Sequence, residues 1–302
     1  MNRIFVSGLL NVETTVAVRG FPINYYPIDY PFFGVNSNVA GVGCNAAKAL
    51  TALGDEVRLV SYTGKDAESE RIFKDLEEHG IASDMIKKEL KKTPASVILF
   101  DPDGRRQVYC DLKDIQEQSV EPGDMKDELD AAAITVLCNI NFNRSLIKYA
   151  HDRGCVTATD VHVLSDTDDG YNKDFMENAR ILFLSDERLP CSPEEFALRL
   201  YEKYRSSVIV IGMGAKGAML LDESIGKPVM IPAYSPEKIV NTVGAGDALF
   251  SAFIHFYAKG MSAEDSLRRA VIFAGIKIGF NGASIGFTTE ENVEHILKKQ
   301  TG

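Results

Sequence analysis

Asn241-Thr242-Val243-Gly244-Ala245-Gly246-Asp247 is followed at once by an apolar stretch with helical spacing, residues 248–256. Gly244 and Gly246 allow a sharp turn and a close approach of the backbone to a ligand. The start of the following helix leaves amide groups without partners and places the positive end of its dipole at the same point. These features predict an anion site, suited to the charge of a transferred phosphoryl group. Asp247, in the first helical turn, could accept a proton there as a general base.

Taken alone, this segment allows a second interpretation, in which the glycines form an ordinary turn and Asp247 only caps a helix. The segment is not a Walker A loop, because no Gly-Lys-Ser/Thr follows it. It is also not in the place of a dinucleotide fingerprint, which follows the first strand, because it lies near the end of the chain.

Outward from this segment, short apolar runs alternate with helical patterns along most of the chain. Strands are predicted at 4–9, 57–62, 134–138, 156–160, 181–184 and 208–212, and helices at 45–53, 69–79, 143–153 and 193–205. This alternation predicts an α/β fold, a doubly wound and mostly parallel sheet with helices on both faces.

Two stretches, residues 12–36 and 93–118, interrupt this alternation. The second reads as a hairpin, with strands at 96–100 and 105–110 joined by Asp101-Pro102-Asp103-Gly104. We expect the two stretches to form a small β-sheet lid over a site, although they could also be two separate surface decorations. The α/β core would then consist of residues 1–11, 37–92 and 119–302.

The composition excludes several classes of protein. The 302 residues are 45% hydrophobic and 25% charged, with a net charge of −10, so no basic face for nucleic acid is expected. The five cysteines are odd in number and form no CxxC pair, which argues against structural zinc and a disulfide framework. The apolar run at residues 4–6 is too short for a signal peptide, and no stretch approaches the roughly 20 apolar residues of a membrane span. We therefore expect a cytoplasmic protein with neither a nucleic-acid nor a membrane partner.

Five segments together resemble the signatures of the ribokinase (PfkB) family of carbohydrate and nucleoside kinases. Residues 240–250 are similar to the second signature, Asp-Thr-x-Gly-Ala-Gly-Asp followed by a small residue and Phe. Residues 40–47, Ala-Gly-Val-Gly-Cys-Asn-Ala-Ala, are similar to the first, Gly-Gly-x-x-x-Asn-x-Ala. The other three are 93–96 with 101–105 (the lid hairpin), 212–217 (the segment before the nucleotide site) and 281–283 (the loop near the adenine).

The resemblance implies a role for each matching residue. Asp247 would be the catalytic base, and Gly244, Ala245 and Gly246 the anion hole. The substrate would contact Gly41 and Asn45, and also Glu13, which stands where the family usually has an Asp. Asn11 and the strand-end Asn139 could contribute to the same pocket. ATP would lie against Asp186, Gly212, Gly214, Gly217, Thr242, Asn281 and Ala283. Phosphoryl transfer also implies Mg²⁺, which Asp186 and Glu187 could hold through water.

Three departures from the family pattern stand out. Asn241 replaces the Asp that, in several members, helps to hold an activating monovalent cation, which argues against potassium activation here. The family's Asn-x-x-Glu motif appears as Asp186-Glu187-Arg188-Leu189. Those two acids could instead be ordinary surface carboxylates. Ala40 replaces the first glycine of the first signature, a small change.

The leading interpretation is ATP-dependent phosphorylation of a hydroxymethyl group on a small sugar. A nucleoside is the alternative substrate, with a base stacked on aromatic residues of the first lid stretch, namely Tyr25, Tyr26, Tyr30, Phe32 and Phe33. The same residues could bury a lid–lid interface, and we expect a homodimer. A non-catalytic ligand sensor on the same fold is a third interpretation. Weaker site candidates are Arg105 on the hairpin and several strand-end residues, namely Asn141, Asn143, Asp160 and His162.

Overall fold

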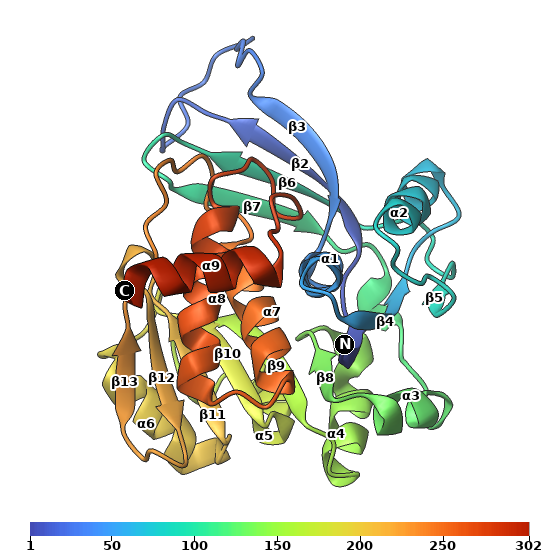
Figure 1. Cartoon of the computed structure of the whole chain (residues 1–302). Helices are drawn as coiled ribbons and strands as arrows, with labels where there is room; N and C mark the ends of the chain where they lie inside the picture. Colours follow the sequence, from blue (N-terminus) through green and yellow to red (C-terminus); the bar gives the residue numbers. More distant parts are fainter. Residues whose placement is uncertain (302) are drawn as a thin grey trace.

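The computed structural model describes residues 1–301, in which two sheets lie one above the other (Figure 1). The larger sheet has nine strands in the order β13-β12-β11-β10-β9-β8-β1-β4-β5. Their bounds are β1 (Arg3–Ser7), β4 (Glu56–Tyr62), β5 (Ile86–Lys87), β8 (Ile134–Leu137), β9 (Thr157–Val163), β10 (Ile181–Ser185), β11 (Val208–Gly212), β12 (Ala218–Asp222) and β13 (Pro228–Ile231). Within this sheet, the neighbouring strands of the series β11-β10-β9-β8-β1-β4-β5 all pair in parallel, which confirms the predicted fold class. β12 and β13, which were not predicted, extend this sheet as antiparallel strands.

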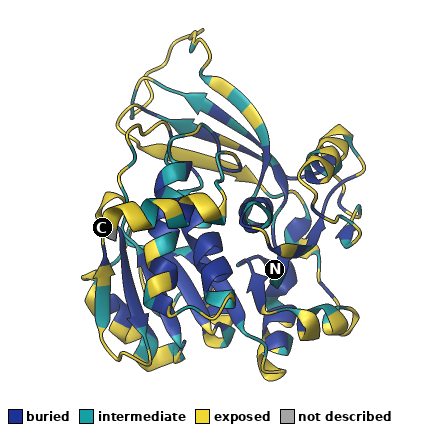
Figure 2. Cartoon of the chain, in the orientation of Figure 1, coloured by how far each residue is buried: buried dark blue, intermediate teal, exposed yellow. Residues whose placement is uncertain are grey.

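Helices cover both faces of the large sheet because its strands are apolar on both sides. Ile4 and Val6 of β1 face one core, and Phe5 between them faces the other. The first core is covered by α1 (Val42–Ala52), α2 (Ala67–Glu78), α7 (Ala245–Ala258), α8 (Ala263–Lys277) and α9 (Glu290–Thr301). The second is covered by α3 (Lys126–Ala131), α4 (Arg144–Asp152), α5 (Lys173–Asn178) and α6 (Pro193–Tyr204). Figure 2 shows the strands between these layers as the most buried part of the chain.

The smaller sheet is the predicted lid. It has the order β3-β2-β6-β7, formed by β2 (Asn11–Ala17), β3 (Val35–Ala40), β6 (Ala95–Phe100) and β7 (Arg106–Asp111). The boundaries expected from the sequence cut through two of these strands. β2 begins at Asn11 and pairs it with Ala40, so residues 37–40 belong to the lid sheet and not to the core. β7 is exposed along its whole length (Figure 2).

Close backbone contacts fix the start of α1 against the end of β1. A Cβ atom on Gly43 would lie 2.7 Å from the backbone carbon of Gly8, and one on Gly41 would lie 2.4 Å from the carbonyl oxygen of Leu9. Gly41 also has a φ of 101°, which a side chain would strain. The helix therefore begins at Val42, three residues before the predicted start, and directs its first turn at the gap between the two sheets.

None of the helices within residues 1–301 is long and apolar enough to cross a membrane.

Candidate active site

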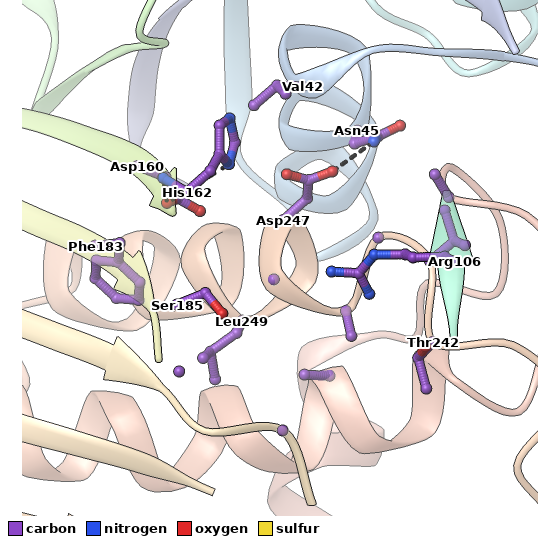
Figure 3. Close-up of a pocket in the computed structure, with 18 of the residues that line it drawn as sticks. Val42, Asn45, Arg106, Asp160, His162, Phe183, Ser185, Thr242, Asp247 and Leu249 are labelled. Atoms are coloured by element: carbon purple, nitrogen blue, oxygen red, sulfur yellow. Dashed lines mark hydrogen bonds and ion pairs between the residues drawn. The ribbon is translucent and has the colours of Figure 1, made fainter. Parts of the chain in front are cut away.

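A cavity of about 850 Å³ lies between the lid and the carboxyl ends of the large sheet's parallel strands. Its floor includes Asn139 after β8, Asp160 on β9 and Ser185 at the end of β10. Ligands in α/β sheets bind at this edge. Its roof comes from alternate residues of the lid strands, because successive side chains on a strand point to opposite faces. Figure 3 shows part of this lining, with side chains from α1, α7 and the lid directed toward one another.

The loop before α7 approaches another chain segment closely. Gly244 has a φ of 78°, and a Cβ atom there would lie 2.5 Å from the carbonyl oxygen of Ala283. The amide of Ala245 donates to the carbonyl of Thr242 at 3.1 Å, while Gly246 is exposed to the cavity. The first turn of a helix leaves amides without helical partners, so this turn offers N–H groups and a positive dipole end to an anion.

Asp247 lies in the first turn of α7 and meets the first turn of α1. Its Oδ2 accepts a hydrogen bond of 2.6 Å from Asn45 Nδ2 (Figure 3). Burial raises the pKa of Asp247 above its ordinary value, and Asp160 adds to this, while His162 and the Asn45 hydrogen bond oppose it. A carboxylate with a raised pKa is a better proton acceptor than an ordinary aspartate.

Three buried oxygens that line the cavity have no hydrogen-bond partner among the described residues. They are Asn11 Oδ1, Glu13 Oε1 and Asn45 Oδ1. The two amide side chains are held by their nitrogen atoms: Asn11 Nδ2 donates to Ser96 Oγ at 2.9 Å, and Asn45 Nδ2 donates to Asp247. Buried polar atoms without a partner are costly, so these three oxygens are suited to hydroxyl donors of a ligand.

Glu13 carries a second mark of a polar ligand site. Burial raises its pKa to about 7, with a further rise from Asp247, while the backbone of Ala283 and the charge of Lys277 oppose the change. The sequence places Glu where the family pattern has Asp, and the longer side chain still reaches the cavity.

Most residues predicted to contact the nucleotide also line this cavity. They include Gly212, Gly214, Thr242 and Ala283. Gly217 also lines it, but its missing side chain serves packing: a Cβ atom there would lie 2.0 Å from the carbonyl oxygen of Ile231.

Asn281 is not part of the cavity lining. Its Oδ1 accepts a hydrogen bond of 3.0 Å from Asn241 Nδ2, which joins the loops that precede α7 and follow α8. The amide pair gives Asn281 a structural partner, so its predicted contact with the nucleotide has no support in the geometry.

The residues predicted for Mg²⁺ both line the cavity, where their carboxylates suit a cation that is bound through one or two acids and substrate phosphates. Glu187 already has a partner in the protein, because its Oε1 forms an ion pair of 2.9 Å with Arg106 Nη2 of the lid. No group of three or more His, Cys, Asp or Glu side chains within residues 1–301 is arranged to hold a metal by itself. Asp186 is therefore the freer of the two predicted ligands.

Two residues of this region were missed by the sequence analysis. Arg106 lines the cavity, whereas the predicted candidate Arg105 pairs with Asp101 at 2.7 Å within the hairpin. Lys277 is completely buried at the end of α8 and donates to the carbonyls of Val243 and Gly282. A lysine at helical spacing from the apolar Ala270 and Phe273 was the available signal for this second residue.

The weaker candidates separate into two groups. Asp160 and His162 line the cavity, and His162 holds a φ of 62° with its amide bonded to Asp160 Oδ1 at 2.8 Å. Asn143 is structural, because it accepts from Ser7 Oγ at 2.6 Å and donates to two backbone carbonyls.

The aromatic residues of the first lid stretch are exposed and lie outside the cavity lining, so none is placed to stack on a bound base. They are Tyr25, Tyr26, Tyr30, Phe32 and Phe33.

The family described as "pfkB family carbohydrate kinase" matches residues 1–290 of this chain. The chain belongs to this family. It is a kinase, like the curated relatives that it resembles. It is 25% identical over 271 residues to the acarbose 7(IV)-phosphotransferase of Actinoplanes sp., covering 89% of each chain. It is 24% identical over 270 residues to the ribokinase of Lactococcus lactis, covering 86% of this chain and 85% of that one.

Solved structures support the fold of the PfkB chain. A microbiome-derived acarbose kinase superposes with a TM-score of 0.86 at 23% identity, covering 98% of this chain and 99% of that one. The ribokinase-like architecture with a separate lid sheet, predicted from the sequence, is thus confirmed.

The raised pKa of Glu13 predicts a pH-dependent stability. The folded protein keeps a proton on Glu13 between its ordinary pKa of 4.5 and about 7, whereas the unfolded chain loses it. Stability therefore falls as pH rises through that window, by on the order of 3 kcal/mol for a shift of this size. Glu13→Gln should remove this loss, as urea unfolding at pH 5 and pH 8 would measure.

The matched control is Glu202→Gln, at an exposed position of α6, which should keep the wild-type dependence. If the free energy of unfolding of Glu13→Gln depended on pH as the wild type does, the pKa of Glu13 would not be raised in the folded protein.

Proposed function

We propose that this kinase transfers the γ-phosphoryl group of ATP to a hydroxymethyl group of a small sugar, with Asp247 as general base. The observation that carries the proposal is the position of Asp247 at the start of α7, beside three buried oxygens that have no partner among the described residues. An acceptor with several hydroxyl groups would satisfy all three oxygens and present one further hydroxyl to the base.

The chain's own residues account for each part of the transfer. Asn11, Glu13 and Asn45 would accept hydrogen bonds from the sugar and so fix its orientation. The Asn45 amide holds Asp247 Oδ2, which leaves the other carboxylate oxygen to take the proton of the attacking hydroxyl.

The phosphoryl group would meet the start of α7, where amides and the helix dipole favour the charge that develops during transfer. Arg106 on the lid lies at the same cavity and would add a positive charge near the phosphates. Magnesium bound with ATP, held through Asp186 and Glu187, would neutralise phosphate charge. The lid would exclude water from the reacting groups.

A panel of acceptors distinguishes the candidate substrates. Ribose, fructose, acarbose, adenosine, cytidine and pseudouridine would each be incubated with Mg-ATP, and the phosphorylated product measured by mass spectrometry. Acarbose is included because one relative is named for its phosphorylation. A sugar product supports the proposal, and a nucleoside product alone would replace it with the nucleoside alternative. Binding of ligands without any product would instead support a sensor.

Asp247→Asn should lower kcat by about 10²–10⁴-fold with little change in ligand affinity, because only proton transfer is removed. Asp265→Asn is the matched control, since Asp265 also lies in the first turn of a helix, α8, but outside the cavity. Rates within the range of the control would remove Asp247 from its proposed role. Titration of ATP and acceptor by calorimetry checks that the variant still binds both.

We also propose a homodimer that forms through the lid. The face of the lid turned away from the cavity exposes Val35, Val97 and Tyr109, close to the exposed aromatic residues of the 18–34 loop. Light scattering after size exclusion should give the mass of a dimer for the wild type and of a monomer for Val97→Lys. Leu198→Lys, an exposed apolar position on α6, should remain dimeric. A monomeric wild type would contradict the proposal.

A further inference from the structure

Lys277, the last residue of α8, is completely buried beside residues 241–246, here called the anion loop. Its ammonium group donates to the carbonyl oxygen of Gly282 at 2.7 Å and to that of Val243. A buried charge is stable only when paired or hydrogen-bonded, and here the partners are two backbone carbonyls. The two carbonyls belong to different segments, one just before Gly244 and the other in the loop after α8.

These two segments are in direct contact at the place where the transferred group would bind. Gly244 packs against Ala283 so closely that a Cβ atom would lie 2.5 Å from the Ala283 oxygen. The ammonium group of Lys277 therefore links the loop that leads into α7 to the loop after α8, which packs against it. Moving either carbonyl would move the first turn of α7 and Asp247 with it.

The charges around Lys277 favour an ammonium ion at neutral pH. Burial lowers its pKa to about 8, while the nearby carboxylates of Asp247 and Glu13 oppose this change. The same lysine lowers the pKa of both carboxyl groups. The ammonium group is thus the cation of a buried cluster with two acids.

A free monovalent cation does not fit this arrangement. The resemblance to the family implies that, in several members, an Asp at the position of Asn241 and the loop after the last signature hold such an ion. Here Asn241 is neutral, and both ends of its amide are in use: Nδ2 donates to Asn281 at 3.0 Å and Oδ1 accepts from the Val243 amide at 2.8 Å. Lys277 already occupies carbonyls of both segments, so a second cation there would face a like charge.

We propose that Lys277 is a tethered replacement for the activating cation, a positioning residue that holds the anion loop so that the enzyme works without potassium. The catalytic part of this inference rests on the proposed function of the loop. Lys277 does not line the cavity, and in this proposal it acts only through the carbonyls of Val243 and Gly282.

Two substitutions separate loss of charge from loss of space. Lys277→Ala removes the whole side chain and leaves room for a small ion, whereas Lys277→Met keeps a stem whose methyl group ends where Cε was. In choline chloride both should lose about 100-fold in kcat, because a misplaced anion loop is costly. Adding ammonium or potassium chloride should restore about tenfold or more in Lys277→Ala alone, since only that variant can admit the ion.

A substrate-free measurement tests the same cation site even if no acceptor has been found. The melting temperature of Lys277→Ala should rise by about 2–4 °C when choline is replaced by potassium or ammonium at equal ionic strength. The wild type and Lys277→Met should show no such rise. Lys48→Ala is the matched control, because Lys48 is also buried but forms its ion pair with Asp75 of α2 and bonds to neither Val243 nor Gly282. It should be destabilised without a cation-specific change.

The wild type alone can overturn the proposal, even if the variants do not fold. Activation of the wild-type kinase by potassium over choline would show that a free cation is still used. Equal loss in both variants, with no response to any cation in rate or melting temperature, would reduce Lys277 to a packing role.

Discussion

The hydrogen bond between Asn45 and Asp247 joins two helix starts that are 202 residues apart in the sequence. Each helix begins at a glycine that has a positive φ, Gly41 before α1 and Gly244 before α7, and each glycine packs against a backbone oxygen. A side chain at either position would push its helix away from the other. The geometry of the proposed base thus depends on two close backbone contacts, and the large sheet serves to bring them together.

Burial of the charged groups of the site costs free energy, and the opposite charges within the cluster of Glu13, Asp247 and Lys277 reduce this cost. Glu13 comes from the lid strand β2, Asp247 from α7 and Lys277 from α8, and burial disfavours the charged form of each. The ammonium group of Lys277 lowers this cost for both acids, and they lower it for Lys277, whereas Asp247 adds to the cost of a charge on Glu13. The oxygens of Asn11, Glu13 and Asn45 remain without partners among the described residues. A ligand rich in hydroxyl groups would complete the arrangement, which connects the electrostatics of the free protein to the substrate class proposed for it.

The sequence predicted the parts of the fold and site that depend on local pattern. The alternation of apolar runs and helices indicated the parallel sheet, and the segment at 241–247 indicated the helix start that carries Asp247. Features set by strand register or by distant contacts were missed. Arg105 and Arg106 are adjacent in the sequence, and only the register of β7 decides which one lines the cavity. The hydrogen bond between Asn241 and Asn281 joins residues 40 positions apart, and the predicted nucleotide contact of Asn281 stays a prediction. β12 and β13 follow a glycine segment that was interpreted only as a ligand site.

The central claim is that the start of α7 is where the phosphoryl group is transferred. A crystal structure with ADP, magnesium, aluminium fluoride and the acceptor selected from the substrate panel tests it directly, because aluminium fluoride mimics the group in transfer. The account predicts the fluoride against the first turn of α7, with one acceptor hydroxyl within hydrogen-bond distance of Asp247. An analogue bound away from this loop, or an acceptor whose hydroxyl faces another side chain, would contradict it.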